Sequence, residues 1–124
     1  CNSLVPGDHG TTYGGNPLVT SAVNAVFDIY EEENILENVK NVGAYLEEKL
    51  DELVNENKNI VLRRGKGLMQ GLVLKTPVGD TINKAIEKGL LVISAAGNVL
   101  RLLPPLIITK ENVDEMINIL KECI

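Results

Sequence analysis

Two stretches of this sequence hold residues that could bind an anion, and Thr11 and Thr12 lie in the first of them, HGTTYGGNP. The stretch is rich in glycine and ends where a helix is expected to begin. Hydroxyls and backbone N–H groups near the positive N-terminal end of a helix favour a phosphate or a carboxylate. However, the spacing matches neither GxxxxGK[ST] nor GxGxxG. The residues alone therefore fit either a structural turn or an anion site.

Arg101 is the candidate in the second stretch, NVLRLLPP, which is otherwise apolar. An arginine in such a run must reach water or be paired. It could form a structural ion pair, or its planar guanidinium could bind a substrate carboxylate through two parallel hydrogen bonds. Pro104 and Pro105 follow closely and should end the strand, because proline has no backbone N–H to donate.

The other polar residues carry weaker signals. His9 is the single histidine and has no serine or cysteine nucleophile beside it, so it is expected in a turn or cap. Lys66 stands between two glycines, a context typical of a solvated hairpin turn. Arg63 and Arg64 are expected on an exposed strand edge, where positive charge discourages aggregation. These residues support no catalytic assignment.

The composition excludes several classes of protein. The chain has 124 residues and a formal net charge of −5, which fits one domain and argues against a nucleic-acid surface. No apolar run approaches the roughly 20 residues that span a bilayer. Cys1 and Cys123 lie at opposite ends of the chain, so neither a disulfide framework nor a metal site is expected. We expect a cytoplasmic location. Because the chain starts at Cys1 instead of Met, we expect it to be a piece of a longer protein.

Hydrophobic periodicity predicts the elements that must position these residues. The order is helix, helix, strand, strand, helix, strand, strand, helix. The helices are expected to start near residues 17, 35, 78 and 110, and the strands to cover 60–64, 68–75 and the two sides of a turn at 96–98. This order predicts an α+β fold: a small, mainly antiparallel sheet of about four strands with helices packed on one side.

Helix starts are predicted from capping residues. Asn16 is a good N-cap and Pro17 a good first helical residue. Asn34 and Glu37 fit a variant of the capping box for the second helix. Thr109 is expected to cap the last helix.

Three motifs, taken in order, resemble the C-terminal part of the class III, pyridoxal-phosphate-dependent aminotransferases: PGDHGTTYGGNPL, RRGKGLMQGLVL and GNVLRLLPPLIIT. The resemblance covers essentially the whole chain. It implies that residues 17–124 form the small C-terminal domain of a fold-type I aminotransferase. Residues 1–16 would be a turn-rich lead-in that carries the cofactor-phosphate motif. The large cofactor-binding domain is expected to be absent from this chain.

The resemblance also implies roles for individual residues. Thr12 would reach across a homodimer interface to the phosphate of pyridoxal 5'-phosphate held by the other subunit, with Thr11 close by. Arg101 would bind the α-carboxylate of the amino-acid or keto-acid substrate. No lysine of this chain matches the family's cofactor-bound lysine, so no catalytic residue is assigned and the isolated piece is not expected to bind the cofactor.

Within the family, the motifs are most similar to the acetylornithine branch. The parent enzyme is then expected to transfer the amino group between N-acetylornithine and 2-oxoglutarate in arginine biosynthesis, while the piece alone should be inactive. The alternatives are an ornithine, succinylornithine or 4-aminobutyrate aminotransferase. A different class of explanation is a non-catalytic association module.

Overall fold

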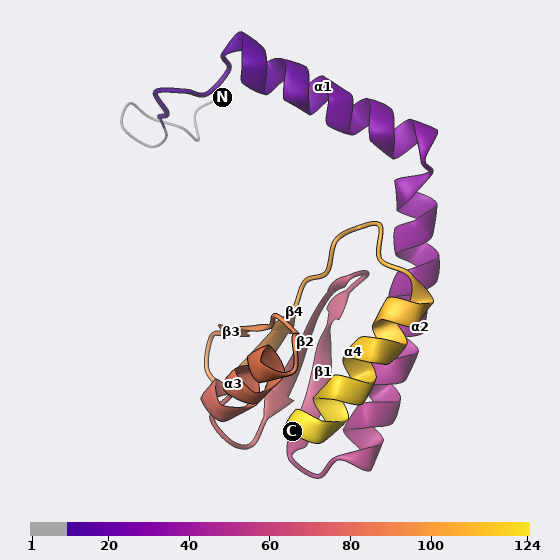
Figure 1. Cartoon of the computed structure of the whole chain (residues 1–124), viewed down its shortest axis with the longest axis vertical. Coiled ribbons are helices and arrows are strands. Elements are labelled where there is room, and N and C mark those ends of the chain that lie inside the picture. The colour runs from indigo at the N-terminus through magenta and orange to yellow at the C-terminus, as the bar shows by residue number, and fades with distance from the viewer. Residues whose placement is uncertain (1–9) are drawn as a thin grey trace, which may run out of the picture. The chain divides into compact units, whose positions relative to one another are not determined.

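The structure is a computed structural model that describes residues 10–124 (Figure 1). His9 and Cys1 lie outside the described residues. The chain divides into two compact units, Cys1–Asn34 and Ile35–Ile124. Each unit is described by itself.

The first unit contains one helix, α1 (Pro17–Glu32). Asn16 has an extended backbone, with φ −72° and ψ 159°, and its side chain accepts a hydrogen bond from the Val19 N–H at 3.1 Å. Pro17 stands at the first helical position, where a backbone N–H would have no partner within the helix, so proline loses no hydrogen bond there. The expected cap is therefore confirmed. None of the residues of α1 is buried.

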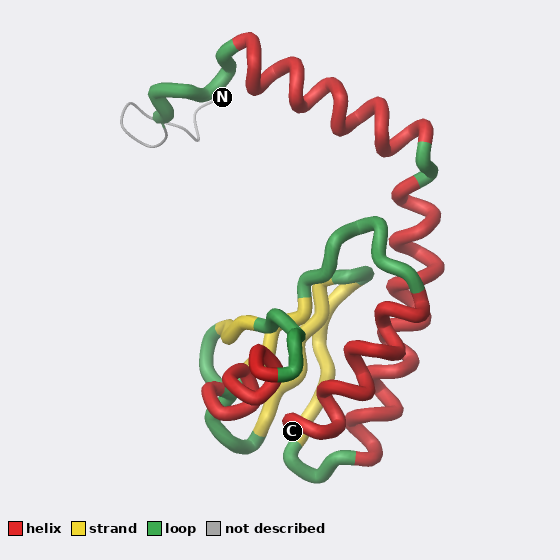
Figure 2. The backbone as a smooth tube through the Cα atoms, in the orientation of Figure 1, coloured by secondary structure: helices red, strands yellow, loops and turns green. Residues whose placement is uncertain are grey.

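The second unit holds the remaining elements in the expected order (Figure 2). They are α2 (Ile35–Glu56), β1 (Ile60–Lys66), β2 (Met69–Leu74), α3 (Gly79–Glu87), β3 (Ile93–Ala95), β4 (Val99–Leu102) and α4 (Lys110–Cys123). The longest loop visible in Figure 2 joins β4 to α4 and contains Pro104 and Pro105.

One cap is confirmed in this unit and one expectation fails. Thr109 caps α4 in a capping box, because its hydroxyl accepts from the Asn112 N–H and the Asn112 side chain accepts from the Thr109 N–H. Asn34, in contrast, has a positive φ of 52°. An N-cap residue has an extended backbone, so the expected Asn34–Glu37 capping box is wrong.

The four strands form one antiparallel sheet in the order β1-β2-β4-β3. β1 and β2 form a hairpin whose loop is Gly67 and Leu68, so the expected turn at 65–67 is wrong in its bounds and Lys66 ends β1 instead. Gly67 has a φ of 57°, a left-handed conformation that glycine adopts without strain. In the register, Arg64 lies opposite Gly71, and Gly71 lies opposite Arg101.

One face of the sheet packs against helices and forms the core. Figure 1 shows α2 and α4 lying side by side along this face. Apolar residues of β2 and β4 alternate inward, and the fully buried side chains of this core include Leu46, Leu50, Leu53, Leu72, Leu74, Leu100, Val113, Leu120 and Cys123. α3 adds Ala85 to the same core. The predicted α+β fold, with its antiparallel sheet of four strands, is confirmed.

No helix among residues 10–124 is both long enough and apolar enough to cross a bilayer. In the same range, no group of three or more His, Cys, Asp and Glu side chains is placed to hold a metal ion.

Candidate functional site

The threonine motif forms a tight turn directly ahead of α1. A Cβ built on Gly14 would meet the Thr11 methyl carbon, so a larger residue at this position would require the Thr11 side chain to move. The side chain of Asn16 joins the turn to the helix: its amide donates to the Tyr13 carbonyl while its oxygen accepts from the Val19 N–H. Thr11 and Thr12 are both exposed. The turn therefore presents two hydroxyl-bearing residues near the N-terminal end of a helix, a donor set that suits a phosphate.

Arg101 lies in β4, between the buried residues Leu100 and Leu102. Because successive side chains of a strand point to opposite faces, Arg101 must point away from the core. It is exposed, and it pairs with Gly71 on one side and Ile93 on the other. No carboxylate lies within 4.0 Å of Arg101 among residues 10–124, so the structural ion pair that the sequence allowed is not formed within this range.

Arg64 and Lys66 share this open face of the sheet with Arg101. Residues that lie directly opposite on paired strands point to the same face, so Arg64, Gly71 and Arg101 form one row. Lys66 lies two residues beyond Arg64 on the same strand. A pocket of about 590 Å³ is lined by all three cations. No Asp or Glu of the described chain lines this pocket.

Arg63 points to the opposite face, where it is part of a polar network. Its guanidinium makes two hydrogen bonds to Asp51, at 2.8 and 3.0 Å, and a third to the Gln70 side-chain oxygen at 3.1 Å. Gln70 is buried and donates to Glu47 at 3.0 Å and to the Gly67 carbonyl at 2.7 Å. The hydrogen bond from Arg63 lowers the pKa of Asp51. The expectation that Arg63 lies on an exposed edge is wrong, since its side chain is only 18% exposed.

A side chain of α2 holds the loop that follows β4. The Asn38 amide donates to the Leu106 carbonyl at 2.8 Å and to the Ile108 carbonyl at 3.2 Å. The loop is closed further by the Ile108 N–H, which donates to the Pro105 carbonyl at 3.2 Å. These bonds fix the chain just beyond β4 and so help to fix the strand that carries Arg101.

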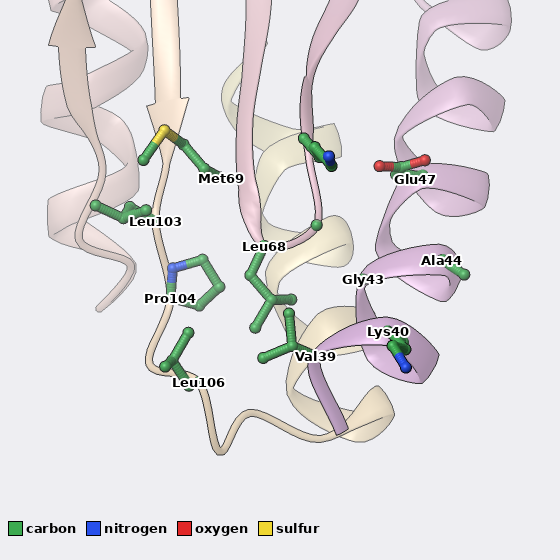
Figure 3. A pocket seen from close by; sticks show the side chains of 12 residues that line it. Val39, Lys40, Gly43, Ala44, Glu47, Leu68, Met69, Leu103, Pro104 and Leu106 are labelled. Atoms are coloured by element: carbon green, nitrogen blue, oxygen red, sulfur yellow. The ribbon is translucent and has the colours of Figure 1, made fainter. Parts of the chain in front are cut away.

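A second pocket, of about 600 Å³, lies between α2, the β1–β2 hairpin and the loop after β4. In Figure 3, Val39, Leu68 and Leu106 gather between α2 and this loop, with Pro104 beside them. These four side chains are apolar. Lys40, Glu47 and Lys66 also line the pocket, so its charges are of both signs, whereas the charged residues that line the pocket around Arg101 are all cations. We therefore take the cationic pocket around Arg101 as the candidate site.

The sequence-predicted residues thus fall in different units. Thr11 and Thr12 belong to the first, and Arg101 to the second. Within the second unit the structure brings Arg101 together with Arg64 and Lys66, which the sequence analysis treated as an edge charge and a solvated turn residue. Arg64 and Lys66 are two residues apart, a spacing that places both on one face of a strand, so the sequence could have grouped them. It could not place them beside Arg101, because that requires the pairing of β2 with β4.

Comparisons with known proteins agree with this fold and these motifs. The family described as aminotransferase class-III matches residues 1–124. An acetylornithine aminotransferase of Aquifex aeolicus is 50% identical over 120 residues, which cover 97% of this chain and 30% of that protein. The crystal structure of acetylornithine aminotransferase from Elizabethkingia anophelis matches with a TM-score of 0.84 and 30% identity, over 98% of this chain and 31% of that one. Plasmodium falciparum ornithine delta-aminotransferase matches with a TM-score of 0.85 and 36% identity, over 97% and 32%.

The chain therefore spans about a third of the length of these relatives. The family match covers every residue of it, and the fold agrees with the solved structures. The chain belongs to the class III aminotransferase family.

Proposed function

We propose that this chain is part of a pyridoxal-phosphate-dependent enzyme that transfers the amino group between N-acetylornithine and 2-oxoglutarate, as in arginine biosynthesis. The curated relatives are named acetylornithine aminotransferases, which supports the amino donor of this pair. The observation that carries the proposal is the position of Arg101: it is exposed on the open face of the sheet, in a pocket that no carboxylate of the described chain lines.

In this proposal, Arg101 binds the α-carboxylate of the substrate. A guanidinium offers two parallel N–H donors that match a carboxylate, so it fixes both the position and the orientation of the substrate. Gly71 and Ile93 flank Arg101 in the sheet, and hydrogen bonds on both sides hold the strand. The residue is thus carried by a rigid element, which is what orientation of a substrate requires.

Thr11 and Thr12 are proposed to bind the cofactor phosphate. Their exposed position near the N-terminal end of α1 fits an anion, and the Asn16 side chain joins the turn to the helix by its bonds to Tyr13 and Val19. By resemblance to the family, the phosphate would be that of pyridoxal 5'-phosphate held by the other subunit of a homodimer. When bound, this cofactor supplies an electron sink for transamination. The chain's own residues supply binding and orientation.

The proposal is tested with the full-length protein that carries this chain. It should transaminate N-acetylornithine with 2-oxoglutarate, and Arg101→Ala should lower kcat/KM for both half-reactions. A hydrogen bond to a charged group contributes about 1.5–3 kcal/mol, which corresponds to a loss of at least about tenfold. Arg101→Lys should recover only part of this loss, because an ammonium cannot make the paired bonds of a guanidinium. Wild-type kinetics in Arg101→Ala would refute the carboxylate assignment.

A second candidate activity is that of an ornithine aminotransferase. It is favoured by the 36% identity to the Plasmodium falciparum ornithine delta-aminotransferase structure. Assaying the full-length protein against free and acetylated ornithine separates the two candidates, because the acetyl group removes one positive charge from the donor. A clear preference for free ornithine would replace the first proposal with the second.

A further inference from the structure

The half-buried Asn38 of α2 makes two hydrogen bonds to a segment 68 and 70 residues further along the chain. Its side-chain amide donates to the Leu106 carbonyl at 2.8 Å and to the Ile108 carbonyl at 3.2 Å. Both partners are backbone carbonyls, which only accept, so the NH₂ group faces them and uses both of its hydrogens. An ionised aspartate has the same shape but no hydrogen to donate. These bonds therefore require an amide side chain at residue 38.

The helix that carries Asn38 is firmly anchored. Leu46 and Leu50 of α2 are fully buried in the core. Closer to Asn38, Gly43 packs directly on the hairpin loop, because a Cβ built on it would lie 3.1 Å from the Gly67 Cα. α2 thus holds the hairpin loop before β2 by backbone packing and the loop after β4 by the bonds of Asn38.

Both attachments lie at the end of the sheet that carries Arg101. Gln70 of β2 pairs with Leu102 of β4, and the next pair is Gly71 with Arg101. The hairpin loop precedes β2, and the loop after β4 begins directly behind Leu102. The segment that Asn38 holds therefore starts two residues after Arg101.

The loop after β4 makes few backbone hydrogen bonds of its own. Pro104 and Pro105 have no N–H to donate. Outside the helices and strands, one backbone–backbone bond of the described chain involves residues 103–108, from the Ile108 N–H to the Pro105 carbonyl at 3.2 Å. That bond closes a turn inside the loop and ties it to no other element. The two bonds from Asn38 supply a polar link between the loop and α2.

We propose that Asn38 is a positioning residue that sets Arg101 for the substrate carboxylate. The inference rests on the proposed function, because it assumes that Arg101 binds this carboxylate. Two parallel bonds between a guanidinium and a carboxylate require a matched geometry, and small displacements of a binding group are costly. Asn38 does not touch the substrate in this scheme. It restrains the loop that continues β4 and, through it, the end of the strand that carries Arg101.

Steady-state kinetics of the full-length protein test this role. Asn38→Ala should raise KM for both 2-oxoglutarate and N-acetylornithine about threefold to tenfold, the factor expected for lost hydrogen bonds. The value of kcat should change less than about twofold, because lost binding that is common to substrate and transition state raises KM alone. Asn38→Asp keeps the size of the side chain and removes both donors, so it should also raise both KM values.

Asn59→Ala is the matched control. Asn59 is likewise a half-buried asparagine, and its amide donates to the Thr76 hydroxyl at 3.0 Å. These two residues lie beyond the ends of β1 and β2 that are opposite the hairpin loop. The control should leave both KM values unchanged. Unchanged KM values in Asn38→Ala, or equal shifts in the control, would overturn the inference.

A double-mutant cycle shows whether Asn38 acts through Arg101. Asn38→Ala should lower kcat/KM about threefold to tenfold in the wild-type protein and less than about twofold in the Arg101→Ala variant. A destabilised fold would lower kcat/KM equally in both backgrounds. Equal effects would therefore show that Asn38 acts independently of Arg101, and the inference would fail.

Hydrogen exchange measures the restraint on the loop directly. Asn38→Ala in the full-length protein should speed exchange of the Ile108 amide, because the loop that contains its bond to Pro105 opens more often. Asn59→Ala should leave this exchange rate unchanged. An Ile108 amide that exchanges equally fast in wild type and Asn38→Ala would contradict the proposed restraint.

A binding measurement separates this inference from the proposed function. Glutarate, an analogue of 2-oxoglutarate that cannot accept an amino group, is titrated calorimetrically into the full-length protein. If the protein fails to transaminate, but Asn38→Ala weakens glutarate binding about threefold to tenfold and Asn59→Ala does not, the proposed function fails and the positioning role stands. If the protein transaminates and Asn38→Ala keeps the wild-type KM values, only the positioning role fails.

Discussion

Arg63 and Arg64 are adjacent in the sequence and have opposite environments. The strand alternates, so Arg63 joins Asp51 and Gln70 at the helix-covered face while Arg64 lines the open pocket. Composition and local sequence could not separate the two, because both residues are arginines in one short strand. The pairing of β1 with β2 decides which arginine faces the core: Arg63 lies opposite the buried Leu72, and Arg64 lies opposite Gly71.

The paired arginine leads to a prediction for pH. The hydrogen bond from Arg63 lowers the pKa of Asp51 below its ordinary value of 3.8. A carboxyl with a lowered pKa in the folded state stabilises the protein above its unfolded pKa, and this contribution is lost as the pH falls through the folded pKa. Asp51→Asn should therefore lower the thermal midpoint of the full-length protein at pH 7, and the difference from wild type should shrink below about pH 4.

The size of this effect should be small. Asp51 has a side chain that is 55% exposed, so solvent screens the pair and the stabilisation is at most about 1 kcal/mol. A double-mutant cycle with Arg63→Gln isolates the pair from other effects of each substitution. A difference between wild type and Asp51→Asn that stays constant from pH 7 to pH 3 would contradict the assignment.

At the scale of elements, the hairpin of β1 and β2 depends on a glycine with no room for a side chain. Gly65 has a φ of 151°, and a Cβ placed on it would lie 2.2 Å from the Met69 carbonyl oxygen and 2.8 Å from the Gln70 Cα. Both of these are backbone atoms, so relief requires the strands to move apart. The geometry of the hairpin therefore leaves no room for a side chain at residue 65.

Gly65→Ala should lower stability by about 1–3 kcal/mol, the usual cost of overpacking. Gly79→Ala is the matched control, since a Cβ on Gly79 meets nothing within 4 Å. Thermal denaturation of the full-length protein should show a clear loss for the first variant and little change for the second. Equal midpoints for the two variants would show that the hairpin relaxes more easily than the structure indicates.

Periodic elements were predictable from the sequence and their ends less so. The stripe of apolar residues in α2 and the alternation in β2 placed these elements and their buried faces correctly, because burial repeats with the helix or strand period. The cap at Asn34 was wrong, since the pattern Asn-x-x-Glu does not reveal the positive φ of 52°. In α3, Ile86 is 50% exposed while Thr81 and Ala85 are buried, so residue type alone does not identify the buried face of this short helix.

At the scale of the whole molecule, the sequence singled out the candidate binding residues one by one but not the pocket around Arg101. Arg101 was recognisable as an isolated charge in an apolar run. The pocket around it requires β4 to pair with β2, a contact between segments about 30 residues apart that local patterns do not encode. The two threonines belong to a different unit from Arg101, so their common role is a proposal that rests on family resemblance.

The composition of the site leads to the last prediction, that the chain of 124 residues produced by itself has no transaminase activity and binds pyridoxal phosphate to no specific lysine. The resemblance to the family assigns the covalent lysine to another domain. Within this chain, the lysine that lines the pocket with Arg101 is Lys66, which is exposed at the end of β1. Incubation with the cofactor, borohydride reduction and peptide mass spectrometry measure where it binds. Stoichiometric labelling of Lys66 that disappears in Lys66→Gln would contradict the prediction, whereas weak labelling spread over many exposed lysines is the expected result.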